Sequence, residues 1–286
     1  MAARSKNRVT INRVTVVILL LLVGGVLGAC GQKSPESTSP SSPSPAPTGG
    51  KKPDYHRAAK IYTELGLGYL SQGQVVRAKD KLTHALKFGP KDADVLTGWG
   101  IYSEHVGDIK DARAYHQKAV QFAKGEQLGP VYDAYGSFLC RQGEWDAAKQ
   151  AFEKAWEDRR SLKLAYFYES AGLCAVDMQR QPEAEDYLSR AIQMDSQRYL
   201  AALALAQLKL HEKNYREASH WLLIYGKYGP QTARSTLMAL QVAKGLHQRD
   251  QAKNLEALFK RSYSDTAEYQ EYLDSMHTTI KPKLEG

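Results

Sequence analysis

The chain of 286 residues carries 39 Lys and Arg residues against 31 Asp and Glu residues, a formal net charge of +8. Four of the basic residues (Arg4, Lys6, Arg8 and Arg13) lie in the first thirteen positions, where no acidic residue occurs. The rest of the chain has 35 basic residues against 31 acidic ones, a net of only +4. So small an excess does not indicate a nucleic-acid-binding protein, and we expect no nucleic-acid partner.

The first thirty residues are typical of an export signal. An apolar run of 16 residues follows the basic segment, from Val14 to Ala29. It is shorter than the roughly 20 residues that span a bilayer. The run ends in Leu27-Gly28-Ala29-Cys30, which resembles the lipobox of bacterial lipoproteins. The resemblance implies that residues 1–29 are removed and that Cys30 is acylated; the alternative is a short transmembrane anchor with an incidental cysteine.

Residue 31 bears on the destination of the lipoprotein. In enteric-type bacteria an Asp after the lipidated cysteine usually retains lipoproteins in the inner membrane. This chain has Gly31 at that position, which favours a lipid anchor in the outer membrane. We therefore expect the chain to face the periplasm.

A linker rich in Ser and Pro separates Cys30 from the folded part. Residues 31–53 contain no aromatic residue and no Val, Leu, Ile or Met. Such a segment cannot bury enough apolar surface to offset the entropy lost on ordering. We therefore divide the chain into a signal peptide (1–29), a lipidated cysteine with a disordered linker (30–54) and a folded domain (55–286).

The folded domain contains a repeat of about 34 residues. Six alanines occur at spacings of 34, 36, 36, 34 and 34: Ala78, Ala112, Ala148, Ala184, Ala218 and Ala252. Small residues such as Gly66 precede them, and large residues such as Leu82 follow, in the order of a tetratricopeptide repeat. This pattern predicts an all-α fold, a tetratricopeptide-repeat superhelix of about six helical hairpins with a C-terminal capping helix.

The first helices of such repeats line a concave face, to which positions 2, 5, 9, 12 and 13 point. Apolar residues at these positions suggest a peptide-binding groove, with Leu67, Leu70 and Ile101 as the chosen contact residues. Further candidates are Tyr166, Leu173, Val176, Leu200, Leu203 and Leu210. The alternative is that these side chains only pack against the opposite wall of the superhelix.

Two cysteines remain besides Cys30. Cys140 and Cys174 occupy positions 12 and 10 of consecutive repeats, whose first helices are neighbours. In an oxidising periplasm they could form a disulfide. The alternative is a pair of buried free thiols that act as small apolar residues.

The sequence contains no catalytic constellation. His211-Glu212 is followed by Tyr215 where a zinc protease helix needs its second histidine. Gly66-Leu67-Gly68 lacks the third glycine of a dinucleotide-binding loop. We therefore expect neither an enzyme nor a cofactor, metal or small-molecule substrate.

Longer segments resemble one protein family. They are Leu65-Gly66-Leu67-Gly68-Tyr69-Leu70 with Gln72-Gly73, and Tyr135-Gly136-Ser137-Phe138-Leu139-Cys140 with Gln142-Gly143. These segments, with Ala151–Ala155 and the family's second cysteine at Cys174, resemble the type IV pilus biogenesis lipoproteins of the PilF/PilW family. The likeness covers about residues 58 to 272. Asp158-Arg159, Ser170 and Asp195-Ser196 depart from the family pattern.

The resemblance implies a pilotin, a lipoprotein that accompanies the pilus secretin to the outer membrane and promotes its multimerisation. It implies a secretin as protein partner and a lipid anchor in the outer membrane. Leu67, Leu70 and Ile101 would then be contact residues, with Tyr62 and Tyr69 supporting their helix from the core side. The alternative is an outer-membrane scaffold that recruits cell-wall hydrolases or other envelope enzymes.

Overall fold

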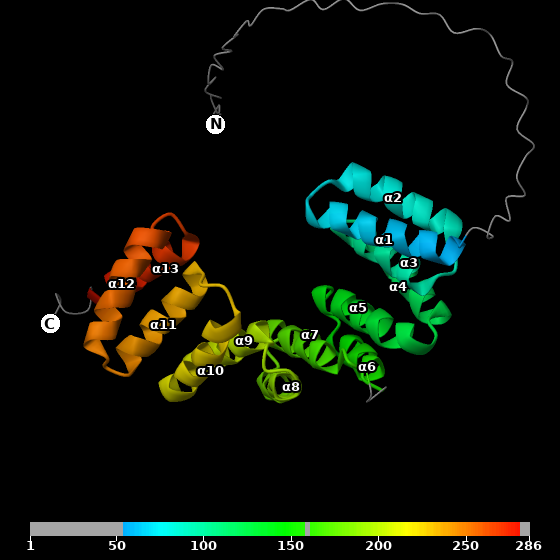
Figure 1. Ribbon diagram of the computed structural model, residues 1–286. Coiled ribbons are helices and arrows are strands. Elements are labelled where there is room, and N and C mark those ends of the chain that lie inside the picture. The colour runs from blue at the N-terminus through cyan, green and yellow to red at the C-terminus, as the bar shows by residue number, and fades with distance from the viewer. Residues whose placement is uncertain (1–53, 158–160, 281–286) are drawn as a thin grey trace, which may run out of the picture. The chain divides into compact units, whose positions relative to one another are not determined.

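The computed structural model describes residues 54–157 and 161–280, with no side-chain detail for 277–280. The predicted signal peptide, Cys30 and the linker lie outside these residues. The helices, shown in Figure 1, are α1 (Tyr55–Ser71), α2 (Val75–Phe88), α3 (Ala93–His105), α4 (Ile109–Phe122), α5 (Leu128–Arg141), α6 (Trp145–Ala155), α7 (Leu164–Asp177), α8 (Gln181–Met194), α9 (Tyr199–His211), α10 (Tyr215–Tyr228), α11 (Ala233–Gly245), α12 (Arg249–Tyr263) and α13 (Ala267–Ile280). A short 3₁₀ helix, η1 (Gly125–Gln127), precedes α5.

The helices pair into six consecutive hairpins followed by a last helix. In each hairpin the first helix packs on the second, as α1 packs on α2 and α9 on α10. The first helices also pack on one another in chain order, from α1 on α3 to α11 on α13. No strand occurs in the described ranges. The predicted all-α fold of about six hairpins with a capping helix is therefore confirmed.

Each hairpin is held by a small residue on its first helix and an alanine on its second. The six repeat alanines, from Ala78 to Ala252, are at most 9% exposed. A Cβ built on Gly66 would lie 2.7 Å from Cγ of Leu82, and one on Gly172 would lie 2.6 Å from Cγ of Leu188. Glycine is needed at these sites because the two helices approach too closely for a methyl group.

The first helix of each repeat is followed, two positions after its last residue, by a residue with positive φ. Gly73, Gly107 and Gly143 serve the first three repeats, with φ of 71°, 82° and 80°. The equivalent residues of the last three repeats are Gln179, Lys213 and His247, with φ of 56° to 58°. The turn geometry is thus conserved along the chain although the glycine is not, at a modest steric cost in the later repeats.

The last helix covers the apolar face of the sixth repeat. Tyr272 of α13 is 5% exposed and lies in one cluster with Phe259 and Leu240. Its ring is 5.9 Å from that of Phe259, at an edge-on angle. Helix α13 therefore acts as the predicted cap, because it removes from water a face that a further repeat would otherwise cover.

Candidate binding face

Three hollows follow one another along the face formed by the first helices of the repeats. Their volumes are about 480, 700 and 810 Å³. We call them the first, second and third hollow. Residues at positions 2, 5 and 9 of their repeats line them: Lys60, Thr63, Leu67, Asp94 and Thr97 in the first; Ile101, Pro130, Asp133, Ser137 and Tyr166 in the second; Gln207, Arg234 and Gln241 in the third. The repeat register thus identifies part of the lining of each hollow, and loop residues and other helix positions supply the rest.

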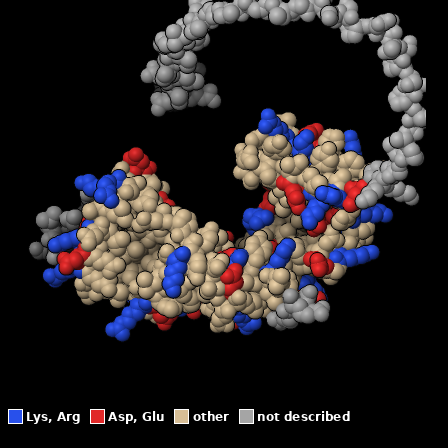
Figure 2. Space-filling view, viewed as in Figure 1, with Lys and Arg blue, Asp and Glu red and all other residues tan. Residues whose placement is uncertain are grey.

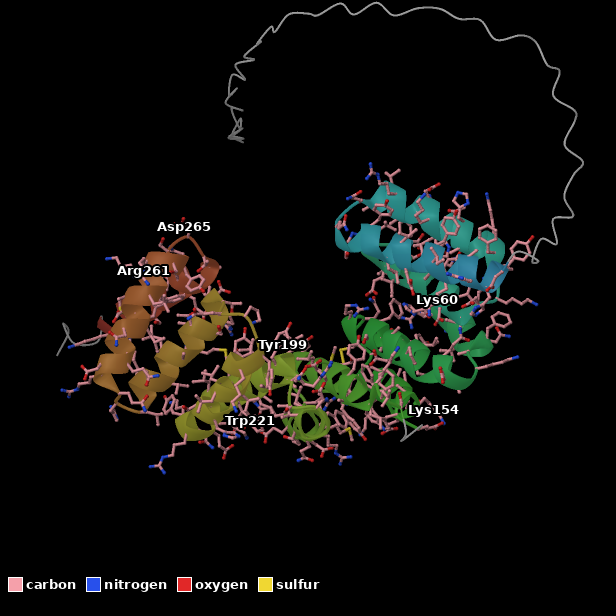
Figure 3. All side chains as sticks on the ribbon, in the orientation of Figure 1. Lys60, Lys154, Tyr199, Trp221, Arg261 and Asp265 are labelled. Carbon is pink, nitrogen blue, oxygen red and sulfur yellow. A yellow bond between two sulfur atoms is a disulfide. The ribbon has the colours of Figure 1, made fainter. Side chains whose placement is uncertain are left out.

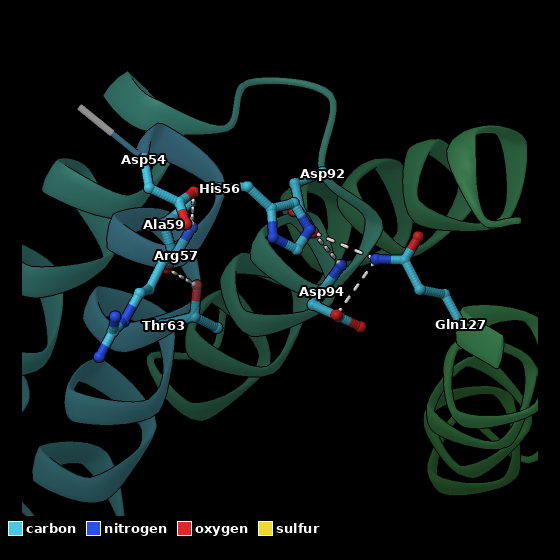
Figure 4. Close-up of polar contacts among 8 residues, drawn as sticks. All are labelled: Asp54, His56, Arg57, Ala59, Thr63, Asp92, Asp94 and Gln127. Carbon is cyan, nitrogen blue, oxygen red and sulfur yellow. Dashed lines mark hydrogen bonds and ion pairs between the residues drawn. The ribbon is translucent and has the colours of Figure 1, made fainter. Parts of the chain in front are cut away.

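The first hollow has a polar wall at the start of α3. Gln127 donates from Nε2 to Oδ2 of Asp94 at 3.1 Å and to Oδ1 of Asp92 at 3.4 Å (Figure 4). Nε2 of His56 lies 3.4 Å from the other oxygen of Asp92. Lys60, labelled in Figure 3, extends from α1 on the side that faces the green helices. The first hollow is therefore lined by an aliphatic side chain, that of Leu67, and by charged side chains of both signs.

The predicted contact residues separate into two groups. Leu67 is half-buried and lines the first hollow, and Ile101 is half-buried and lines the second. The two hollows adjoin, because Pro130 and Lys163 line both of them. Leu70, in contrast, is only 5% exposed and belongs to a core cluster with Leu82 and Tyr102. We therefore correct the prediction for Leu70: its side chain is a core group rather than a contact surface.

The burial of Leu70 has a reason that the next two repeats share. Position 12, which Leu70 occupies, faces the next first helix of the domain. In the second repeat this position is Glu104, whose carboxylate accepts from Nε and Nη2 of Arg141 at 2.5 and 2.7 Å. In the third repeat it is Cys140, which forms a disulfide with Cys174 of α7. In the first three repeats position 12 therefore connects neighbouring repeats, whereas Leu210 and Lys244, the position 12 residues of the fifth and sixth repeats, line the third hollow.

The disulfide lies inside the largest core cluster. Cys140 is 5% and Cys174 4% exposed, and the Cα atoms are 5.9 Å apart, within the usual range for a disulfide. The bridge links α5 to α7 across 34 residues of sequence. It therefore fixes the spacing between α5 and α7, and both helices line the second hollow.

The other predicted groove residues vary in exposure. Tyr166 is 48% and Leu200 45% exposed, as a contact surface requires. Leu173 and Val176 are half-buried and pack against the core cluster around Phe138 and Tyr168. Leu203 and Leu210 are also half-buried, and Leu210 lines the third hollow. Some of these residues are thus exposed, as a peptide-binding groove requires, and others pack within the superhelix.

Tyr62 and Tyr69 lie on the side of α1 that faces α2. The Tyr62 ring stacks on those of His84 and Phe88, at 5.2 and 5.7 Å between centroids. The guanidinium carbon of Arg77 lies 5.8 Å from the centroid of the Tyr69 ring. Both tyrosines therefore brace α1 from the side away from the first hollow.

Sequence reasoning missed Asp133, which is the most unusual group of the second hollow. Its side chain is almost fully buried, at 4% exposed, and it is a position 5 residue of the third repeat. Burial raises the pKa of this carboxyl to about 7, against the opposing effects of the Ser170 hydroxyl and the Lys163 charge. A charged residue at a position that faces the groove was the sequence signal that could have revealed it.

Charges on the visible surface do not form a single-sign patch. Figure 2 shows blue Lys and Arg side chains interspersed with red Asp and Glu side chains over the surface seen in that view. Within the described ranges, no helix has the length and apolar character needed to cross a membrane. The same residues contain no cluster of three or more His, Cys, Asp or Glu side chains suited to a metal ion.

The repeat register, the hairpin packing and the grooved inner face define a tetratricopeptide-repeat protein. No family model matches the sequence. The chain is 29% identical over 215 residues to the type IV pilus assembly protein PilF of Pseudomonas aeruginosa, covering 75% of this chain and 84% of PilF. An uncharacterised protein of Haemophilus influenzae is 30% identical over 145 residues, covering 51% of this chain and 80% of that protein.

Solved structures agree with the sequence comparison. The structure of Pseudomonas aeruginosa PilF matches with a TM-score of 0.66 at 28% identity, over 77% of this chain and 99% of that one. PilW, described as a widely conserved type IV pilus biogenesis factor, matches with the same TM-score at 22% identity, over 75% of this chain and 98% of that one. The chain is thus homologous to PilF and structurally similar to PilF and PilW, which are tetratricopeptide-repeat proteins of type IV pilus biogenesis.

Proposed function

We propose that this protein is an outer-membrane lipoprotein that binds the type IV pilus secretin and promotes its localisation and multimerisation. The observation that carries the proposal is the homology to PilF, which spans 84% of PilF and coincides here with a repeat domain whose inner face is hollowed. Tetratricopeptide-repeat folds commonly bind extended or helical segments of other proteins on that face.

The proposed mechanism joins a protein contact to a lipid anchor. Acylation at Cys30 would hold the chain at the outer membrane, and the Ser/Pro linker would let the repeat domain reach into the periplasm. A secretin subunit bound by the repeats would then be kept near other subunits at the same membrane. Confinement of this kind raises the effective concentration of subunits and favours assembly of the ring.

The proposed contact surface consists of Leu67 and Ile101 with the adjoining parts of the first and second hollows. Both residues are half-buried, so each has an accessible part to offer a partner and a packed part that fixes its position. Pro130 and Lys163 border both hollows and make one continuous surface of them. An apolar anchor residue of the partner could contact Leu67 or Ile101 there.

The first experiment is a secretin assay in a strain that lacks this protein. Unboiled gels of outer membranes should show secretin multimers replaced by monomers. Wild-type protein should restore the multimers, and Cys30→Ala should restore fewer of them because the lipid anchor is lost. Normal multimer levels in the deletion strain would reject secretin assembly as the function and favour the envelope-scaffold alternative.

The contact surface has a separate test with a matched control. Leu67→Glu and Ile101→Glu should each lower secretin multimer levels while the helical content of the protein stays unchanged. Val76→Glu makes the same chemical change at an apolar side chain of α2 that is 84% exposed and lies on an outer helix. This control should leave multimers at the wild-type level; equal effects of all three changes would reject the site.

A further inference from the structure

The second hollow contains a buried carboxyl with an unused hydrogen-bonding site. Oδ1 of Asp133 is shielded from solvent and has no hydrogen-bond partner among the described residues. Burying an acceptor without a donor costs the folded state the hydration that this atom had in water, so such groups are rare in folded proteins. A group of this kind beside a hollow of about 700 Å³ is suited to a donor that a bound molecule brings.

The surroundings of Asp133 indicate what kind of donor would fit. Arg141, Lys163 and Arg198 all line the same hollow. Arg141 pairs with Glu104, and Arg198 pairs with Asp195 and Glu169, but their positive charges still border the space. A cationic side chain of a ligand would meet these three cations, whereas a neutral N–H or O–H group would not.

The apolar part of the hollow indicates the rest of the ligand. Ile101, Pro130 and Tyr166 supply aliphatic and aromatic walls, and Tyr166 is 48% exposed. The hollow lies along the row of first helices, between the first and third hollows. An extended peptide that follows this row would present a backbone N–H at short intervals, with side chains alternating between the walls and solvent.

We propose that Asp133 is a peptide-binding residue: it accepts a neutral N–H or hydroxyl group from an extended peptide whose apolar side chain packs against Ile101 and Tyr166. The proposal deepens the proposed function and rests on it for the biological source of the peptide. It also assigns a role to Arg141, Lys163 and Arg198, which disfavour basic residues at the centre of the bound segment and favour acidic ones beside it.

A dependence of binding on pH follows from this geometry. The titratable and charged groups around Asp133 are Lys163, Tyr166 and Glu169 with Arg141, Asp195 and Arg198, and no histidine lines the hollow. Because the pKa of Asp133 is about 7, the carboxyl changes charge in the neutral range. A ligand that donates to it binds the ionised form better, so affinity should fall by about tenfold between pH 8 and pH 6.

The test uses peptides selected from a random peptide library on the full-length chain in detergent at pH 8. Selected peptides should be poor in Lys and Arg at their centre and should lose about tenfold in affinity at pH 6. Asp133→Asn keeps the shape of the side chain but cannot ionise, so it should bind more weakly at pH 8 and show no such pH dependence. Asp146→Asn, an exposed residue of the outer helix α6, is the matched control and should behave as wild type.

Each result separates this proposal from the proposed function. If no peptide is selected, or if Asp133→Asn binds with wild-type affinity and pH profile, the assignment of Asp133 is wrong. The secretin gel described above would be unaffected by that failure. Conversely, pH-dependent peptide binding through Asp133 in a protein that does not affect secretin multimers would support this inference and reject the secretin as partner.

Discussion

The imidazole of His116 packs directly against Gly100: a Cβ on Gly100 would lie 2.8 Å from Nε2 of the ring. His116 is fully buried between α3 and α5, and its ring is 5.0 Å from that of Phe138. Neither ring nitrogen has a hydrogen-bond partner in the described part of the chain. The equivalent residues of the neighbouring repeats are Leu82 and Phe152, so His116 occupies a position that is apolar in both neighbours.

His116 should make the protein less stable in acid. Burial lowers its pKa from 6.5 to about 4, so the unfolded chain takes up a proton that the folded chain rejects. The stability from this residue is complete above pH 6.5 and is lost as the pH falls towards 4, by up to about 3 kcal/mol. The His116→Leu variant should not show this loss. In urea unfolding, its free energy of unfolding relative to wild type should therefore be higher at pH 4.5 than at pH 7. The same difference at both pH values would contradict this prediction.

Asp133 should make the protein less stable as the pH rises, which is the reverse of the effect of His116. Its pKa is raised from 3.8 to about 7, so its contribution to stability is greatest below pH 3.8 and decreases as the pH rises through 7. The whole change is at most about 4 kcal/mol. Asp133→Asn should therefore gain in unfolding free energy over wild type between pH 5 and pH 8. Because His116 and Asp133 have opposing effects, the free energy of unfolding of each variant is compared with that of wild type at the same pH. If the difference between Asp133→Asn and wild type did not change with pH, the raised pKa of the buried carboxyl would be contradicted.

Two glycines of α1 should respond differently to the same substitution. A Cβ on Gly66 would lie 2.7 Å from Cγ of Leu82, whereas one on Gly68 would have nothing within 4 Å. Gly66→Ala should cost about 1 to 3 kcal/mol through overpacking. Gly68→Ala should instead stabilise the protein by about 0.5 to 1 kcal/mol, because alanine favours the helix. Thermal unfolding of both variants measures this; equal shifts would show that the α1–α2 contact is looser than described.

Leu70 and Leu67 should also differ, although both are leucines of α1. Leu70→Glu would place a carboxylate in a core cluster at 5% exposure and should lower stability by about 3 kcal/mol or more. Leu67→Glu changes a half-buried side chain that can turn its carboxylate to solvent, so its melting temperature should stay close to wild type. Loss of secretin multimers in Leu70→Glu would therefore report on folding. A stable Leu70→Glu protein would restore Leu70 as a surface residue.

The disulfide is testable without reference to any partner. Peptide mapping under non-reducing conditions should recover the segments around Cys140 and Cys174 as one linked species. Reduction, or Cys174→Ala, should lower the unfolding free energy by about 3 to 4 kcal/mol, as expected for a closed loop of this length. Recovery of both cysteines as separately alkylated peptides would show two buried thiols instead.

Much of the architecture could be predicted from the sequence because it depends on short-range periodicity. The alanines from Ala78 to Ala252 mark one contact in every repeat, and a hairpin with a fixed close contact has few ways to stack on the next. The lining of the hollows at positions 2, 5 and 9 follows from the same register. The region before Tyr55 could be interpreted only by composition and by resemblance to lipoprotein signals.

Other features depended on how neighbouring repeats pack. The sequence by itself determined that Leu70 is apolar and in groove register, but only the tertiary structure decided that this side chain is buried in a core cluster with Leu82 and Tyr102. It likewise determined that Asp133 and His116 are polar residues at repeat positions. Their unusual pKa values come from burial by α7 and by α3 and α5, which lie beyond the local repeat pattern. Periodicity is a local property of the chain, whereas desolvation depends on every element that surrounds a group.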